Sequence, residues 1–481
     1  MPPTAVLFVC LPMEGHIRPL AQVAAALQRL GSFDVELAAC EQSRATIEAL
    51  APHVSLQSLG ELSDEQARRA AVAFDTSKPS APLPGRAEKA ADMFTVLEEA
   101  LFPAVRSLLV NAAGRYAVVA TDQATLAAHD AAEEAGLPLV VLPQLPLSYA
   151  LVMAGQNAAN MCRWVPVEMP GCVAAERLGW WQAYFSNPHA KKRVAAVFTH
   201  AYASRRAPVR QRLGLPSLPP GSGPLQPPPG IPAVLHIAGG VMELEVARKL
   251  PPGWHMSGPQ GLPAQVPALD GGKHTEVAAF FQAAADAGEG VVYCALGTLV
   301  APHAELTQAM AAAFEAVPGV RFLWALKQAS QAFLPAHLLA PPPAGSGGRV
   351  LVVPWAPQAA VLAHPAVQLF VTHGGLGSLH EGLAAGKPLL TLPFFADQHV
   401  NAQRMVNRRL GMTVDPCPTA IQSLPHRLST AITAMLADSS MAQRAAEVGE
   451  RLRAMSGAET AARLIRQFVT SQAGGVAEGR A

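Results

Sequence analysis

Two polar residues follow short apolar runs in the first half of the chain. His16 comes after the run 6–11 and a glycine, and Asp122 directly follows the run 116–121. Imidazole titrates near neutrality and can take a proton from an alcohol, and the imidazolium formed needs a carboxylate partner. A lone buried acid would be costly, so a His16–Asp122 pair built from two strand ends explains both positions. A histidine that only satisfies its own turn is the alternative.

A glycine-rich turn follows another apolar run in the second half. The run 367–372 leads into the sequence HGGLGS, where a helical pattern begins. Glycines let a backbone approach a ligand closely, and the N–H groups at the start of a helix hold phosphate oxygens. Ser378 could cap that helix or bond a phosphate, and His373 could donate to a diphosphate. The same turn could also be no more than a tight connection.

A second turn, 391–398, closes with Asp397 and Gln398 after an apolar run. Such polar groups suit hydrogen bonding to sugar hydroxyls.

The whole segment 355–398 resembles the nucleotide-sugar signature of the UDP-glycosyltransferase family, whose fold is GT-B. The match has no gap over 44 residues and includes W-A-P-Q, T-H-G-G, E-G-x-x-x-G-x-P and the final D-Q. The resemblance implies that Trp355 stacks on uracil, although core packing is the alternative for that ring. It also implies that Gln358 lies beside the base and ribose and that Glu381 binds the ribose hydroxyls.

The resemblance also implies roles around the diphosphate and the sugar. Asp397 and Gln398 would recognise the transferred sugar. With glutamine at the last position, the motif resembles that of glucose-preferring members. Plant members have Trp-Asn where this chain has Leu376-Gly377, which removes one sugar contact and one phosphate contact. The diphosphate turn is implied to contain His373, Gly375, Gly377 and Ser378.

Two further stretches match the same family. The sequence VVYCALGT at 291–298 resembles its first C-terminal strand, so Thr298 is expected to contact phosphate or base, or else to cap a turn. G-H-I-x-P at 15–19 resembles its catalytic histidine loop, with Asp122 as the partner aspartate. The sequence has no D-x-D pair, and we expect no cofactor and no metal.

Alternating strand and helix patterns must position these residues. The pattern predicts strands at 6–11, 35–40, 116–121, 137–142, 234–238, 291–296, 322–326, 350–354, 367–372 and 389–392. Two Rossmann-like doubly wound halves facing across a cleft are expected, which is the α/β class. The expected domains are 1–258 for the acceptor, a linker at 259–278, 279–455 for the nucleotide sugar, and 456–481 as a returning helix plus a disordered tail. The proline-rich stretch 216–232 is expected to be an exposed loop of the first domain, with an interdomain linker as the alternative.

The composition of the chain limits the classes of partner that we expect. The 481 residues have a formal net charge of +1, which gives no basic patch for nucleic acid. Six scattered cysteines predict neither disulfides nor a zinc site. Neither a signal peptide nor a transmembrane run of about 18 apolar residues is evident. We expect a soluble, cytoplasmic monomer.

Together these observations predict an inverting, metal-independent hexosyltransferase that uses a UDP-sugar, with glucose preferred. The acceptor would be a small apolar molecule such as a phenolic, flavonoid, terpenoid or sterol. The loops 74–93, 147–163 and 180–185, which carry Phe, Met, Trp and Tyr residues, are the candidates for its pocket. The alternatives are a catalytically silent nucleotide-sugar binding protein, a GT-B nucleotide-sugar epimerase and a lipid-precursor transferase.

Overall fold

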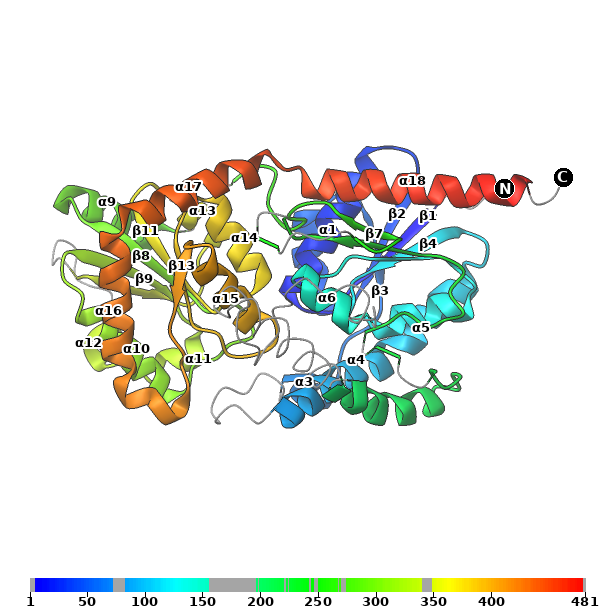
Figure 1. The fold of residues 1–481 in the computed structure, drawn as a ribbon, viewed down its shortest axis with the longest axis horizontal. Helices are drawn as coiled ribbons and strands as arrows, with labels where there is room; N and C mark the ends of the chain where they lie inside the picture. Colours follow the sequence, from blue (N-terminus) through cyan, green and yellow to red (C-terminus); the bar gives the residue numbers. More distant parts are fainter. Residues whose placement is uncertain are drawn as a thin grey trace, which may run out of the picture. The chain divides into compact units, whose positions relative to one another are not determined.

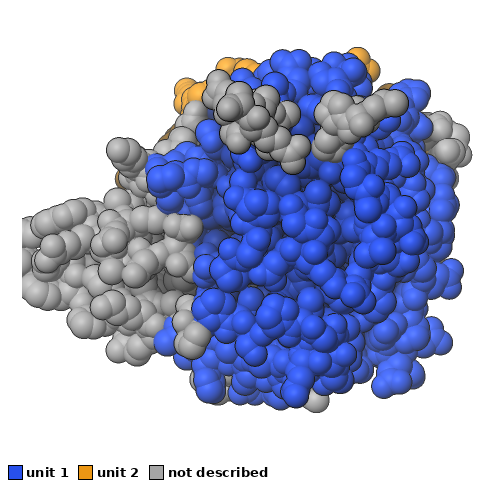
Figure 2. Space-filling model, turned by 90° about the vertical axis from the view of Figure 1, so that its right-hand side faces the viewer, with its two compact units in different colours: residues 1–73, 82–262, 455–481 blue, residues 74–81, 263–454 orange. Residues whose placement is uncertain are grey.

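The chain forms two compact units in a computed structural model (Figure 2). The first unit holds the described residues up to Leu262 and from Met455 onward, and the second holds those from Pro263 to Ala454. The structure describes residues 5–71, 83–154, 196–197, 199–219, 222–223, 225–241, 244–245, 250–266, 268–269, 274–339 and 348–478.

The first unit is built on a parallel sheet of order β3-β2-β1-β4-β5-β6-β7. Every residue of the central strand β1 is buried, as expected for a parallel sheet covered on both faces. The strands are β1 (Ala5–Val9), β2 (Asp34–Ala39), β3 (Ser55–Ser58), β4 (Tyr116–Thr121), β5 (Leu139–Val141), β6 (Val234–Ala238) and β7 (Trp254–Met256). The helices of this unit include α1 (Glu14–Arg29), α2 (Arg44–Leu50), α3 (Asp64–Ala71), α4 (Leu83–Asn111), α5 (Leu126–Glu134), α6 (Leu147–Met153) and α18 (Gly457–Glu478).

The last helix, α18, packs against α1 in the first unit (Figure 1). Ala461, Ala462 and Ile465 are fully buried in the same core as Leu20 and Ala24 of α1. Small alanines let the two helices approach closely, and the buried apolar surface holds the end of the chain on this sheet. The helix extends to Glu478, within the segment 456–481 for which a returning helix and a disordered tail are expected.

The second unit has a parallel sheet of order β10-β9-β8-β11-β12-β13. One face packs against α10 and α16, where the buried ring of Trp324 meets Phe314 edge-on at 5.1 Å. The strands are β8 (Gly290–Ala295), β9 (Val320–Ala325), β10 (Val350–Val353), β11 (Val367–Thr372), β12 (Leu389–Thr391) and β13 (Gly411–Thr413). The helices are α9 (Thr275–Ala287), α10 (Ala304–Glu315), α11 (Gln328–Gln331), α12 (Ala336–Leu339), α13 (Gln358–Ala363), α14 (Leu376–Ala384), α15 (Gln398–Asn407), α16 (Leu424–Ala437) and α17 (Ser439–Ala454).

Every strand expected from the sequence is present, with ends shifted by no more than two residues. The strands that the sequence analysis missed are β3, β7 and β13, and each lies at an edge of its sheet. Edge strands are short and have a neighbour on one side only, so their sequences need not form a continuous apolar run. The sequence of β3, SLQS, shows this directly.

The start of α1 differs from the prediction. The sequence places His16 in a turn, but α1 begins at Glu14 and His16 is its third residue. Pro19 obscures this start because proline in a helix normally indicates its first turn.

The proline-rich stretch 216–232 lies in the first unit, and its described residues form neither helix nor strand. Leu225 and Ile231 are buried and attach it to the unit, so it is neither fully exposed nor an interdomain linker. In the part of the chain that the structure describes, we find no helix with the length and apolar content needed to span a bilayer.

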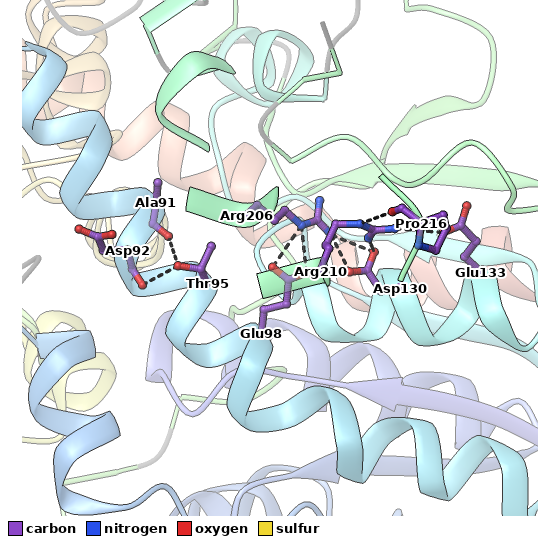
Figure 3. Close-up of polar contacts among 9 residues, drawn as sticks. All are labelled: Ala91, Asp92, Thr95, Glu98, Asp130, Glu133, Arg206, Arg210 and Pro216. Carbon is purple, nitrogen blue, oxygen red and sulfur yellow. Dashed lines mark hydrogen bonds and ion pairs between the residues drawn. The ribbon is translucent and has the colours of Figure 1, made fainter. Parts of the chain in front are cut away.

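A buried ionic network joins α4, α5 and the helical residues 199–212 (Figure 3). Arg206 lies 3.0 Å from Glu98 of α4 and 2.9 Å from Asp130 of α5, and Arg210 also pairs with Asp130. Both arginine side chains are 2% exposed. Burial raises the pKa of Glu98 although Arg206 opposes that shift. Arg210 also lies 3.5 Å from Glu133, so each buried guanidinium group has two carboxyl partners, and such pairing is the condition for burying a charge.

Candidate active site

The structure brings His16 and Asp122 together at the carboxyl ends of neighbouring strands in the first unit. Strand β1 leads to His16 at the start of α1, and β4, which pairs with β1, ends directly before Asp122. Nδ1 of His16 lies 3.1 Å from Oδ2 of Asp122. The carboxylate is fully buried, whereas the imidazole side chain is 18% exposed.

Three donors besides His16 hold the Asp122 carboxylate. Its Oδ1 accepts hydrogen bonds from the backbone N–H groups of Ala124 and Thr125 at 2.6 and 3.0 Å, and its Oδ2 accepts one from the Thr125 hydroxyl at 2.9 Å. Burial by itself raises the pKa of Asp122, but His16 and these donors hold it below its ordinary value. The group is therefore a fixed carboxylate at neutral pH.

His129 of α5 contacts the backbone carbonyl of Asp122. Its Nε2 lies 3.0 Å from the Asp122 carbonyl oxygen, and burial lowers its pKa to about 4. A neutral ring that donates from Nε2 to this carbonyl holds the end of β4 in place. The sequence analysis missed both His129 and Thr125. The spacing D-x-x-T, which is typical of local side-chain capping, could have indicated Thr125.

The donor-binding candidates all lie in the second unit, at the carboxyl ends of its parallel strands. His373 follows β11 directly, and its half-buried ring lies beside Gly297 and Gly375. A Cβ atom at Gly375 would lie 2.4 Å from its Nε2, and one at Gly297 would lie 2.6 Å from its Cε1. The ring fits because both neighbours are glycines. Burial lowers its pKa to about 4, so at neutral pH the ring is an uncharged hydrogen-bond donor.

The glycine turn leads into α14 as the sequence predicts. Gly374 has a φ of +84°, and Gly375 occupies the N-cap position. Ser378 is the third residue of α14 and does not cap it, so of its two expected roles capping is wrong. Gly377 is exposed, with open space around its α-carbon, so its lack of a side chain is not needed for packing.

Gln358, Ser378 and Glu381 lie together beside this turn. The amide nitrogen of Gln358 donates to Glu381 at 2.6 Å and lies 3.4 Å from the Ser378 hydroxyl. Trp355 comes just before, after β10, and its side chain is 63% exposed. The core-packing alternative for Trp355 is therefore wrong, and the ring of His274 lies 5.6 Å away, centre to centre.

Thr298 is exposed in the loop after β8. Its carbonyl oxygen accepts a hydrogen bond from the ammonium group of Lys327, a residue that the sequence analysis did not select. Burial lowers the pKa of Lys327.

Asp397 is the N-cap residue of α15 and Gln398 is its first residue, and both side chains make hydrogen bonds within this region of the chain. Oε1 of Gln398 accepts from the backbone N–H groups of Phe394 and Phe395 at 2.8 and 3.2 Å. Oδ2 of Asp397 accepts from Asn401 at 2.8 Å. The residue between these groups, Ala396, has a φ of +52°, which is strained for a residue with a side chain.

The predicted acceptor residues fall mostly outside the described part of the chain. This holds for 180–185, for 155–163 and for 74–82. Within the described parts, Met93 on α4 and Leu147, Leu151 and Met153 on α6 are buried.

Comparison with solved structures bears on the fold. Two solved structures share the fold of this chain. The alignment with the glycosyltransferase of kitacinnamycin covers 97% of this chain and 99% of that one, with a TM-score of 0.66 and 19% identity. A UDP-glucosyltransferase from Polygonum tinctorium covers 98% and 99%, with a TM-score of 0.65 and 19% identity. The predicted α/β class with a GT-B fold is confirmed.

The sequence of the second unit matches a known protein family. The model described as "UDP-glucoronosyl and UDP-glucosyl transferase" matches residues 268–448, so the predicted resemblance to the UDP-glycosyltransferase family is confirmed over this region. An anthocyanidin 3-O-glucosyltransferase from Zea mays is 44% identical over 118 residues, 24% of each chain. One from Vitis vinifera is 46% identical over 116 residues, again 24% of each. These matches span about a quarter of the length of the curated relatives.

Proposed function

We propose that this protein is an inverting, metal-independent glycosyltransferase that moves a hexose, preferably glucose, from a UDP-sugar to a hydroxyl group of a small apolar acceptor. The observation that carries the proposal is the 3.1 Å separation of His16 Nδ1 and the buried Asp122 carboxylate. The relatives named as anthocyanidin glucosyltransferases support a flavonoid as the acceptor.

The base is assigned by tautomer chemistry. A carboxylate beside Nδ1 favours the proton on that nitrogen, which leaves the lone pair on Nε2. Nε2 would take the acceptor's hydroxyl proton while the hydroxyl oxygen bonds to the anomeric carbon. The bond from that carbon to the diphosphate oxygen breaks, and UDP leaves with the electron pair. Attack opposite the leaving group inverts the anomeric configuration. Asp122 would stabilise the imidazolium that forms.

The second unit would bind the donor. Trp355, with its exposed ring, would stack on the uracil, and Gln358 and Glu381 would contact the base and ribose hydroxyls. The N–H groups at the start of α14 and the neutral ring of His373 would donate to the diphosphate as its charge develops. Asp397 and the amide nitrogen of Gln398 would contact the sugar.

Labelled transfer tests the proposal. Purified protein is incubated with UDP-[¹⁴C]glucose, EDTA and a panel of flavonoids, simple phenols, sterols and terpenols, and labelled glycoside is measured. We expect product from the wild type and none above background from His16→Ala. The control is His337→Ala, which removes another histidine paired with a carboxylate, Glu315, but one that is 62% exposed and lies in the second unit.

Each other result has a defined meaning. UDP binding by calorimetry without transfer to any acceptor would favour the silent binding protein. A requirement for added Mg²⁺ or Mn²⁺ would contradict the metal-independent mechanism. Absence of UDP binding would overturn the proposal as a whole.

A further inference from the structure

Asn401 connects two loops at the carboxyl edge of the second sheet. It is the fourth residue of α15 and is completely buried. Its side-chain Nδ2 donates to the carbonyl oxygen of Gly374, after β11, at 2.9 Å. The same nitrogen donates to Oδ2 of Asp397, after β12, at 2.8 Å. One amide group therefore holds both the glycine turn that follows β11 and the loop after β12 that ends at Asp397.

The bond to Gly374 fixes a peptide group that is otherwise easily rotated. The peptide between Gly374 and Gly375 has no Cβ atom on either side, so little steric resistance opposes a flip of its plane. In a trans peptide the C=O and N–H groups point in opposite directions. Because the Gly374 carbonyl is directed at Asn401, the Gly375 N–H is directed away from it, next to the first N–H groups of α14.

We propose that Asn401 is a positioning residue that orients the Gly374–Gly375 peptide so that the Gly375 N–H binds the diphosphate of the donor. The inference rests on the proposed function, since it assumes a nucleotide diphosphate at this turn. Through Asp397, the same side chain couples the position of the diphosphate to that of the transferred sugar.

The chemistry of the contact requires an amide. Both groups that face Nδ2 are acceptors, a carbonyl and a carboxylate, and an NH₂ group supplies one hydrogen to each. An aspartate of nearly the same shape would place a second carboxylate against both. Oδ1 of Asn401 is buried without a hydrogen-bond partner among the described residues, so the two donated bonds account for the orientation of the side chain.

The test compares UDP with uridine, because only UDP has a diphosphate. Affinities of the full chain for both ligands are measured by calorimetry for the wild type, Asn401→Ala and Asn401→Asp. We expect UDP affinity to fall about tenfold or more in both variants, as for a lost hydrogen bond to a charged group, and uridine affinity to change by less than about twofold. Only folded protein binds uridine, so the ratio of the two affinities corrects for any unfolded fraction.

The matched control is Gln403→Ala, which removes a side-chain hydrogen bond to Asn407 within the same helix. It should keep the wild-type ratio. A wild-type ratio in both Asn401 variants, with UDP still bound by the wild type, would overturn this inference and leave the proposed function intact. Failure of the wild type to bind UDP at all would overturn both.

Discussion

The Asp122 carboxylate lies 3.1 Å from Nδ1 of His16 and is fixed by Thr125 and two backbone N–H groups, while the imidazole alone reaches solvent. A pair of this kind can accept a proton from a hydroxyl group, because the ring is accessible and the buried carboxylate balances the charge that the ring gains.

Asp122→Asn keeps the shape of this pair but removes the charge. We expect kcat to fall between about a hundredfold and ten-thousandfold, the usual contribution of a general base. The double variant His16→Ala/Asp122→Asn should be no slower than His16→Ala alone, because the two residues act as one unit. Steady-state kinetics with saturating UDP-glucose measure this. Additive losses in the double variant would contradict the pairing, and UDP affinity serves as the control that should not change.

The two glycines around the start of α14 should respond differently to alanine. Gly375→Ala places a Cβ atom 2.4 Å from Nε2 of His373 and must displace that ring, so UDP affinity should fall about tenfold with a small change in Tm. Gly377→Ala meets open space and should raise the stability by about 0.5–1 kcal/mol, since alanine favours the helix. Calorimetry and thermal unfolding give both values. Equal effects of the two variants would show that His373 does not depend on Gly375.

The exposed ring of Trp355 should contribute to nucleotide binding and little to folding. Trp355→Ala should weaken UDP binding by about 1–3 kcal/mol, the range of base–aromatic stacking. Its Tm should stay within about 2 °C of the wild type, because a side chain that is 63% exposed loses little packing. Trp355→Phe, which keeps an aromatic face, is the control and should recover most of the affinity. Unchanged UDP affinity in Trp355→Ala would remove this residue from the donor site.

His236 should make the first unit sensitive to acid. Its ring stacks on Trp254 at 4.2 Å, and burial lowers its pKa to about 3. Below the ordinary histidine pKa of about 6.5, the unfolded chain binds a proton that the folded chain does not. The free energy of unfolding therefore decreases by about 1.4 kcal/mol for each unit by which the pH is lowered. This loss continues until the pH reaches the folded pKa.

His236→Phe keeps the stacked ring and removes the titrating group. Urea unfolding at pH 7 and pH 5 should show a smaller loss of stability for the variant than for the wild type. The measurement at pH 7 is the control, because there the two proteins differ only in packing. The same loss in both proteins would mean that His236 does not contribute to acid sensitivity.

The buried network should matter far more to stability than a surface pair does. Arg206→Met leaves Glu98 and Asp130 buried without their shared partner and should cost about 3–5 kcal/mol. Arg106→Ala removes an ion pair with Glu134 whose members are 53% and 37% exposed, and it should cost less than about 1 kcal/mol. Urea unfolding measures both. Similar costs would show that the network is compensated when Arg206 is lost.

The sequence by itself determined the α/β class, the central strands and the order of the motifs along the chain. Central strands of parallel sheets are buried on both faces, so β1 and β4 have nearly continuous apolar sequences, and the apolar part of β11 is interrupted only by the exposed Gln368. Glycine-rich turns and polar residues after such strands stand out against that pattern, which is why His16, Asp122 and the turn at His373 could be selected.

The tertiary structure decided which side chains meet, because contacts between distant segments leave no local pattern. The edge strands β3, β7 and β13 gain their form from a single neighbouring strand. His129 is selected only by its place behind Asp122, and Asn401 only by the meeting of two loops that follow β11 and β12. Gly375 and Gly377 are alike in sequence, yet only Gly375 has the ring of His373 against it. A residue's type limits what it can do, and its three-dimensional neighbours select among those possibilities.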